Sequence, residues 1–125
     1  MPRVVHFEIP ADNPGGAVKF YETVFNWKIE KWTGPMDYCL FTTREDKELG
    51  INGDITPKAN LAATTNTIDV SYVDDALKKI TEAGGKVVMP KRVVPSQGYL
   101  AYCAGTVGNV FGVFKNDPSL NRLAR

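Results

Sequence analysis

The chain contains a single histidine, His6, and its imidazole is the first candidate for chemistry. A histidine changes charge near neutral pH, so it can exchange protons with a bound molecule, and its neutral ring binds metal ions. Three roles stay open for His6: a hydrogen-bonded structural residue, a contact to a ligand, or a proton-transfer group. The sequence offers no nucleophile–base pair, phosphate-binding glycine loop or Cys-x-x-Cys pair to accompany it. His6 by itself therefore defines no reaction.

Four carboxylates are predicted to lie on the same kind of strand face as this imidazole, the face that points away from the helices. Side chains alternate between the two faces of a strand, so His6 and Glu8 lie on one face of the predicted first strand. The same alternation places Glu48, Asp54 and Asp69 on the faces of their own strands that point away from the helices. A histidine combined with two carboxylates would suit iron or manganese. Acidic residues solvated at the rim of a cleft would give the same pattern, and this alternative stays open.

Composition excludes several classes of protein. The 125 residues correspond to one domain, and 43% hydrophobic with 23% charged residues is typical of a soluble globular protein. Fifteen Lys and Arg balance fourteen Asp and Glu, so strong steering toward nucleic acid or an anionic membrane is not expected. No apolar run approaches the roughly 20 residues that span a bilayer, and residues 1–10 lack a secretory hydrophobic region. We expect a cytoplasmic protein whose two cysteines are buried thiols.

Two amphipathic helices position the strands. Asn13 followed by Pro14 is typical of a helix start, and apolar residues at positions 17, 20, 21, 24 and 25 form one stripe. The second helix is predicted to begin at Ser71, with Asp74 three residues later as a capping box. The Gly84-Gly85 pair predicts its left-handed end.

Short strands account for most of the rest. The predicted strands cover residues 4–9, 28–32, 38–43, 48–55, 65–70, 86–93, 98–103 and 109–115. The order strand–helix–strand–strand–strand therefore occurs twice, in a module over about 1–57 and another over about 64–116, before a polar tail at 117–125. A hairpin turn at Asn52-Gly53 is an alternative that would shorten the fourth strand. Polar residues on the strand faces opposite the helices predict either a solvated sheet surface or a cleft.

The motifs in this order resemble the vicinal oxygen chelate superfamily, which includes glyoxalase I, bleomycin-resistance proteins, fosfomycin-resistance enzymes and extradiol dioxygenases. The resemblance rests on His6, then Phe20-Tyr21 and Val24-Phe25-Asn26-Trp27, and in the second half on Asp74-Asp75-Ala76-Leu77, Gly84-Gly85-Lys86-Val87 and Gly108-Asn109-Val110-Phe111-Gly112. It implies an α+β fold in which two βαβββ modules form a cup-shaped mixed sheet with helices on the outer face. It also implies a homodimer.

Metal-dependent members of that superfamily hold a divalent ion with up to four His and Glu side chains. The resemblance places His6 at the first ligand position. The second falls near Gly50 to Asn52, the third at Thr65 and the fourth at Gly112, and none of these offers His or Glu. Because catalytic metal sites usually keep about three protein ligands, we predict no metal and no cofactor.

The sequence therefore predicts a homodimeric protein that binds a small organic molecule in the cup without a metal, and has no nucleic-acid or membrane partner. The predicted ligand-binding residues are His6, Asn52, Thr65, Thr67 and Gly112. No catalytic residue is assigned, and whether the protein is an enzyme stays open. The alternative is a metal-dependent lyase, isomerase or dioxygenase in which carboxylates of the same parity replace the missing ligands.

Overall fold

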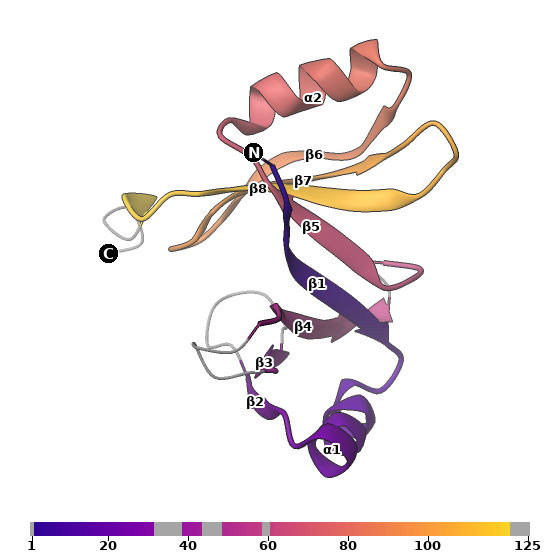
Figure 1. Ribbon diagram of the computed structural model, residues 1–125, viewed down its shortest axis with the longest axis vertical. Helices are drawn as coiled ribbons and strands as arrows, with labels where there is room; N and C mark the ends of the chain where they lie inside the picture. Colours follow the sequence, from indigo (N-terminus) through magenta and orange to yellow (C-terminus); the bar gives the residue numbers. More distant parts are fainter. Residues whose placement is uncertain (1, 32–38, 44–48, 59–60, 121–125) are drawn as a thin grey trace. The chain divides into compact units, whose positions relative to one another are not determined.

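A computed structural model describes residues 2–31, 39–43, 49–58 and 61–120. The chain divides into two compact units. The first unit is Val5–Thr65, and the second unit combines Met1–Val4 with Asn66–Arg125. The elements follow the order strand–helix–strand–strand–strand twice, as Figure 1 shows, which confirms the predicted α+β fold of two βαβββ modules.

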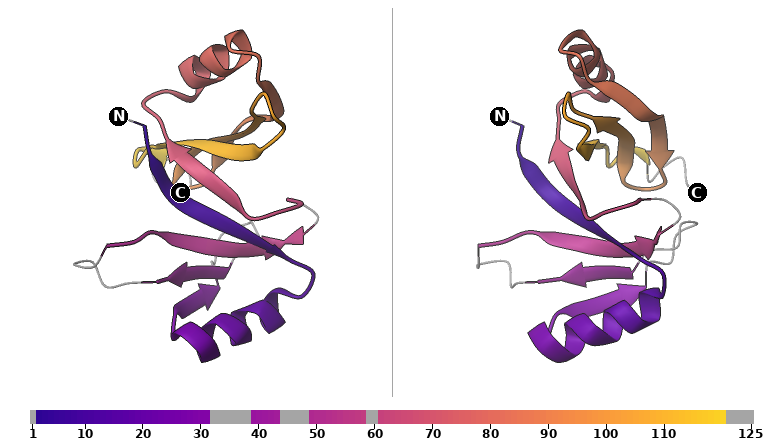
Figure 2. Two further views of the ribbon diagram at one scale, coloured as in Figure 1. Left: turned by 45° about the vertical axis from the view of Figure 1, so that its right-hand side comes forward. Right: turned by 90° about the vertical axis from the view of Figure 1, so that its right-hand side faces the viewer.

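The first unit carries four strands and one helix. Its elements are β1 (Val4–Ala11), α1 (Pro14–Phe25), β2 (Lys28–Lys31), β3 (Cys39–Thr42) and β4 (Asn52–Pro57). The strands lie in the order β2-β3-β4-β1, with β1 parallel to β4 and the other two pairs antiparallel. Helix α1 packs against β2 and β4 (Figure 2). The pairing of β1 with β4 brings together residues that are more than forty positions apart in the sequence.

The second unit repeats this topology. Its elements are β5 (Thr65–Asp69), α2 (Val73–Glu82), β6 (Lys86–Val94), β7 (Gly98–Ala104) and β8 (Val110–Asn116). The strands lie in the order β5-β8-β7-β6, with β5 parallel to β8. Helix α2 packs against β6, β7 and β8. Val73, Ala101 and Val113 form the buried core under this helix. The equivalent order of the strands confirms the internal duplication predicted from the sequence.

The helix ends agree with the sequence in part. The side chain of Asn13 accepts a hydrogen bond from the Gly16 N–H at 3.1 Å, so it caps α1 as predicted. The capping box predicted at Ser71 is wrong, because the N-cap of α2 is Tyr72 and no side chain caps it. Ser71 precedes the N-cap by one residue, and a side chain caps a helix from the N-cap position itself. Gly84 has a φ of +96° and provides the predicted left-handed end.

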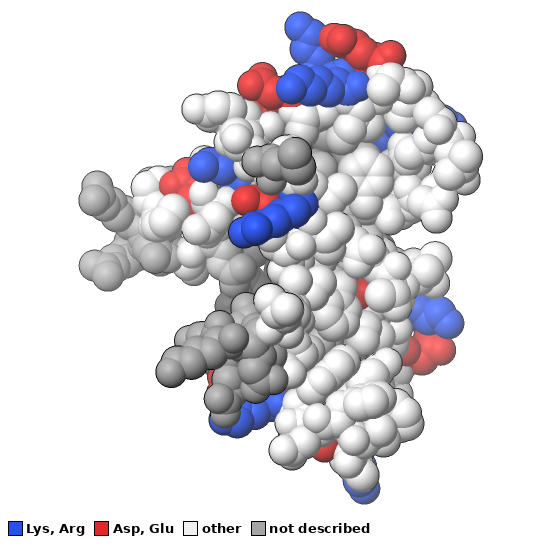
Figure 3. Space-filling model, in the orientation of Figure 1, with Lys and Arg blue, Asp and Glu red and all other residues white. Residues whose placement is uncertain are grey.

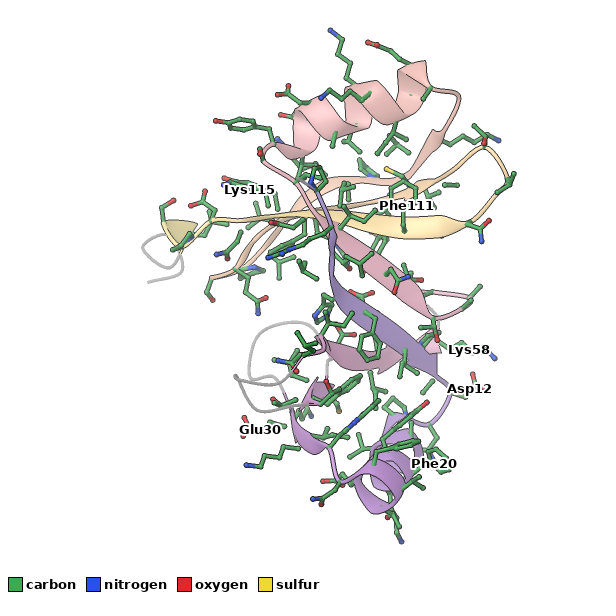
Figure 4. All side chains as sticks on the ribbon, viewed as in Figure 1. Asp12, Phe20, Glu30, Lys58, Phe111 and Lys115 are labelled. Carbon is green, nitrogen blue, oxygen red and sulfur yellow. The ribbon has the colours of Figure 1, made fainter. Side chains whose placement is uncertain are left out.

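An aromatic cluster packs around the buried Phe41 in the first unit. The Trp27 ring stacks on Phe41 with ring centroids 4.8 Å apart and on Tyr21 at 5.0 Å, and Phe7 meets Phe41 edge-on at 5.1 Å. None of the twelve residues of α1 is buried, so the predicted apolar stripe of this helix is covered only in part. Phe20, which Figure 4 labels on α1, is 55% exposed.

Strand β4 passes through Asn52 and Gly53, so the alternative of a hairpin turn at this pair is wrong. A Cβ on Gly53 would collide with the carbonyl oxygen of Phe7 and would lie 3.0 Å from the ring of Phe41. Glycine is therefore required at this position, where β4 lies between β1 and β3. The predicted start of this strand at residue 48 lies outside the described residues, as does Glu48 itself.

Lys and Arg lie close to Asp and Glu in both units. Figure 3 shows Lys and Arg beside Asp and Glu over α2, where Lys91 contacts Asp74 at 2.9 Å. In the first unit Lys58 lies 3.6 Å from Asp12, a pair that Figure 4 labels. Neither of the described helices has the length and apolar character needed to cross a bilayer.

Candidate functional site

The pairing of β1 with β4 builds a polar site around the single histidine. The two strands run parallel, with His6 opposite Asn52 and Glu8 opposite Asp54. Because alternate residues of a strand point to the same face, these four side chains share one face of the strand pair. Nε2 of His6 lies 2.7 Å from Oδ2 of Asp54, which is a short hydrogen bond or ion pair.

The two carboxylates of this face are buried, whereas the imidazole is not. Glu8 is 4% exposed and Asp54 is 3% exposed. The side chain of His6 is 31% exposed, so a molecule in solvent can reach it. Asp54 thus orients the imidazole through its contact with Nε2. This arrangement is one that acid–base sites use, in which a buried carboxylate orients a histidine.

Burial controls the electrostatics of Asp54. Removal from water raises the pKa of its carboxyl group above the ordinary value of 3.8, and the hydrogen bond and charge of His6 oppose that rise. Its second oxygen, Oδ1, is buried and has no hydrogen-bond partner among the residues that the structure describes. A buried acceptor without a partner costs free energy, so Oδ1 is an atom that a bound molecule or ion would satisfy.

His6, Glu8 and Asp54 together have the composition of a metal site. One donor atom from each of the three residues can be chosen so that all three lie within 4.8 Å of one another. We refer to these residues as the His6–Glu8–Asp54 cluster. All three belong to the first unit.

Two other predicted site residues, Asn52 and Thr65, have structural contacts. The side-chain oxygen of Asn52 accepts a hydrogen bond from the Thr43 N–H at 3.1 Å, and Asn52 is exposed. The hydroxyl of Thr65 donates a hydrogen bond to the carbonyl oxygen of Ala63 at 2.8 Å, and Thr65 is buried. The first bond joins the end of β3 to the start of β4, and the second lies at the start of β5. Ligand binding by these two residues stays a prediction.

The remaining two predicted residues, Thr67 and Gly112, face each other in the second unit. They are partners in the parallel pairing of β5 with β8. A Cβ on Gly112 would lie 3.2 Å from the Thr67 hydroxyl oxygen, which is buried without a partner among the described residues. The register of β5 and β8 therefore brings these two residues together. Their contact with a ligand stays a prediction.

Comparison with known proteins identifies the family. The family model of the Glyoxalase/Bleomycin resistance protein/Dioxygenase superfamily matches residues 3–113. The chain belongs to this superfamily. None of the curated proteins compared with the chain matches it. The superfamily resemblance noted in the sequence is thereby confirmed.

Solved structures show the same fold at low sequence identity. Methylmalonyl-CoA epimerase from Mycobacterium tuberculosis has a TM-score of 0.71 at 11% identity, covering 95% of this chain and 91% of that chain. A variant of methylmalonyl-CoA epimerase from Streptomyces coelicolor, in complex with 2-nitronate-propionyl-CoA, has a TM-score of 0.69 at 12% identity, covering 91% and 94%. NAD-dependent benzaldehyde dehydrogenase from Legionella pneumophila has a TM-score of 0.65 at 12% identity, covering 90% and 98%.

The His6–Glu8–Asp54 cluster offers better donor atoms for a divalent ion than the five predicted ligand-binding residues do. The sequence pattern predicts that Glu8 and Asp54 lie on the same kind of strand face as His6, but neither belongs to the predicted ligand-binding site. The alternation of β1 reveals Glu8, since it is two residues from His6. Asp54 becomes a neighbour only through the parallel pairing of β1 with β4, which the sequence pattern does not specify. The other two carboxylates of this parity lie elsewhere, Asp69 on β5 and Glu48 outside the described residues.

Proposed function

We propose that this protein binds a small organic molecule at the polar face of β1 and β4, with the His6–Asp54 pair as the central contact. The observation that carries the proposal is the 2.7 Å contact between a partly exposed imidazole and a buried carboxylate. Such a pair presents an oriented, ionisable group to solvent. Membership of the superfamily supports a small molecule as the ligand, although one fold serves many functions.

The chemistry of the pair indicates what the ligand contributes. When Asp54 is ionised, it keeps the proton of the imidazole on Nε2, and the other ring nitrogen, Nδ1, is then an acceptor. A ligand with a hydroxyl group or an acidic C–H could donate to that nitrogen. In the metal-free protein, the buried Oδ1 of Asp54 would accept a second hydrogen bond from the ligand. We therefore infer a ligand that carries a proton donor, with proton exchange at His6 as the step this chain can perform.

The methylmalonyl-CoA epimerases among the similar structures support this chemistry only by analogy of fold, because their identity to this chain is about a tenth. An acyl-CoA thioester is one candidate class, since its α-carbon carries an acidic proton. Hydroxy acids and dicarbonyl compounds are others. A probe panel should include all three classes together with methylmalonyl-CoA.

The single histidine makes the test direct. In protein labelled with ¹⁵N at histidine, the imidazole gives one set of resonances, and a ligand bound at this face should shift them. Each panel compound is first screened for a rise in melting temperature, because a ligand that binds the native state stabilises it. Asp54→Asn should weaken binding, while Asp12→Asn, a change at an exposed carboxylate near Lys58, should leave it unchanged. A compound that binds without moving the imidazole resonances would contradict the location, and a panel without binders would contradict the proposed function.

Three finer statements from the sequence remain predictions. These are a homodimer, a cytoplasmic location, and binding without a metal. The last rested on the absence of His and Glu at three ligand positions of the superfamily.

A further inference from the structure

We propose that the His6–Glu8–Asp54 cluster binds a divalent cation, with Mn²⁺ and Fe²⁺ as the ions that its donors suit. One imidazole nitrogen and two carboxylate oxygens form the donor set, which favours these ions over ions that prefer thiolates. The proposal replaces the metal-free interpretation of the sequence with the alternative that carboxylates of the same parity take over from the missing ligands.

The buried charge of the cluster is the first argument. Glu8 and Asp54 are 4% and 3% exposed, and an ionised carboxylate is costly to bury without positive charge nearby. A divalent cation between the three side chains would balance both carboxylates and would leave the imidazole neutral, which is the form that binds metals.

The orphaned oxygen is the second and independent argument. Asp54 is more than nine-tenths buried, and its Oδ1 has no partner within the described part of the chain. Buried polar atoms without partners are uncommon in folded proteins and often mark the place of an ion or a water molecule. A cation held by Asp54 would satisfy this atom directly.

The spacing of the donors agrees with coordination. Oxygen and nitrogen ligands lie about 2.0–2.6 Å from a bound divalent ion, so two ligands of one ion are at most about 4–5 Å apart. The three donor atoms of the cluster lie within 4.8 Å of one another. An ion that contacts both carboxylate oxygens of Asp54 would displace the proton that His6 and Asp54 share, and the 2.7 Å contact of that pair would lengthen.

This site differs from the arrangement that the resemblance implied. Its residues come from β1 and β4 alone, so all three lie within the first unit, and neither Thr65 nor Gly112 takes part. Three protein ligands leave coordination positions open for water or for oxygen atoms of a substrate. The organic ligand of the proposed function could occupy these positions, but the cation site does not depend on it.

Titration of the full chain with Mn²⁺ tests the proposal. Protein freed of metal by a chelator and then desalted is titrated at neutral pH, and free Mn²⁺ is measured by electron paramagnetic resonance. We expect one Mn²⁺ per chain. Glu8→Gln and Asp54→Asn should each weaken the affinity at least about tenfold, a typical minimum for loss of a metal contact. Asp69→Asn is the matched control, because Asp69 is the other described carboxylate of this parity and is exposed. Its affinity should stay within about twofold of the original.

A second readout locates the ion and separates loss of binding from loss of folding. Bound Mn²⁺ is paramagnetic and should broaden the imidazole resonances of the single histidine, while circular dichroism confirms that each variant is folded. Absence of Mn²⁺ binding, equal affinity in Asp54→Asn and the original protein, or binding that leaves the imidazole resonances sharp would overturn the proposal. Loss of the cation site with retention of an organic ligand would leave the proposed function standing.

Discussion

Replacement of Asp54 by asparagine should make the metal-free protein more stable. Asparagine has nearly the same shape as aspartate and can keep a hydrogen bond to His6, but it carries no charge to desolvate. A residue kept for binding commonly reduces stability, and its removal then raises the free energy of unfolding. The opposite expectation would hold if Asp54 were part of a structural ion pair.

The burial of Asp54 and His6 determines the size of the expected gain in the free energy of unfolding. Asp54 is 3% exposed, and the rise of its carboxyl pKa shows that desolvation outweighs the hydrogen bond and charge of His6. Loss of a charge-assisted hydrogen bond costs about 1.5–3 kcal/mol, whereas the desolvation of a buried carboxylate costs several. The side chain of His6 is 31% exposed, so it does not become an isolated buried charge when Asp54 is neutralised. We expect Asp54→Asn to increase the free energy of unfolding by about 1–2 kcal/mol at pH 7, and the melting temperature by several degrees.

The pH dependence follows from the direction of the pKa change. The folded protein holds the Asp54 proton to a higher pH than the unfolded chain, whose carboxyl titrates near 3.8. Between these two pKa values the native state binds more protons than the unfolded state, so the stability of the original protein falls as the pH rises. The advantage of Asp54→Asn should therefore be full above the raised pKa and should shrink as the pH falls toward 3.8.

Urea unfolding followed by tryptophan fluorescence, in the presence of a chelator and at several pH values, measures this difference. Asp12→Asn serves as the control, because the side chain of Asp12 is 82% exposed and its pair with Lys58 is worth little. A loss of more than about 1 kcal/mol in Asp54→Asn, or a difference that does not change with pH, would refute the reasoning that desolvation dominates at this carboxylate.

Three further substitutions test the packing that positions the site. Gly53→Ala should lower the free energy of unfolding by about 1–3 kcal/mol in urea titrations, because its Cβ would collide with the Phe7 carbonyl oxygen, whereas Gly105→Ala, with open space around the added atom, should change it by less than about 0.5 kcal/mol. Phe41→Ala removes a ring that is 2% exposed in the aromatic cluster and should cost about 3–5 kcal/mol by the same assay; a cost below about 1 kcal/mol would contradict the packing. Asn13→Ala removes the cap of α1 and should cost about 0.5–2 kcal/mol by thermal unfolding, with recovery in Asn13→Asp.

The fold could be predicted from the sequence because its signals are local. The Asn13 cap, the Gly84 stop and the alternation of the strands each depend on a few neighbouring residues, and their order repeats. The details that failed depend on longer contacts. The start of α2 moved from Ser71 to Val73, where the helix packs its first buried side chain against the strands. Asn52-Gly53 has the composition of a turn, yet its place between two strands keeps it extended.

The site was predictable only in part for the same reason. His6 stood out as the single histidine, and Glu8 follows from the alternation of one strand. Asp54 comes from a strand 48 residues further along the chain, and only the parallel register of β1 and β4 brings it to the imidazole. Asn52 was chosen from its position; its side chain accepts a hydrogen bond from the Thr43 N–H, and its contact with a ligand stays a prediction. Neighbouring strands determine such contacts, so the pattern of one strand cannot distinguish Asn52 from Asp54.

A crystal structure of the protein soaked with Mn²⁺, with anomalous scattering recorded for manganese, would test the central claim most directly. The account predicts one strong anomalous peak about 2.0–2.5 Å from an imidazole nitrogen of His6 and from carboxylate oxygens of Glu8 and Asp54. A map without a peak at this cluster, with Nε2 of His6 still bonded to Asp54, would contradict it.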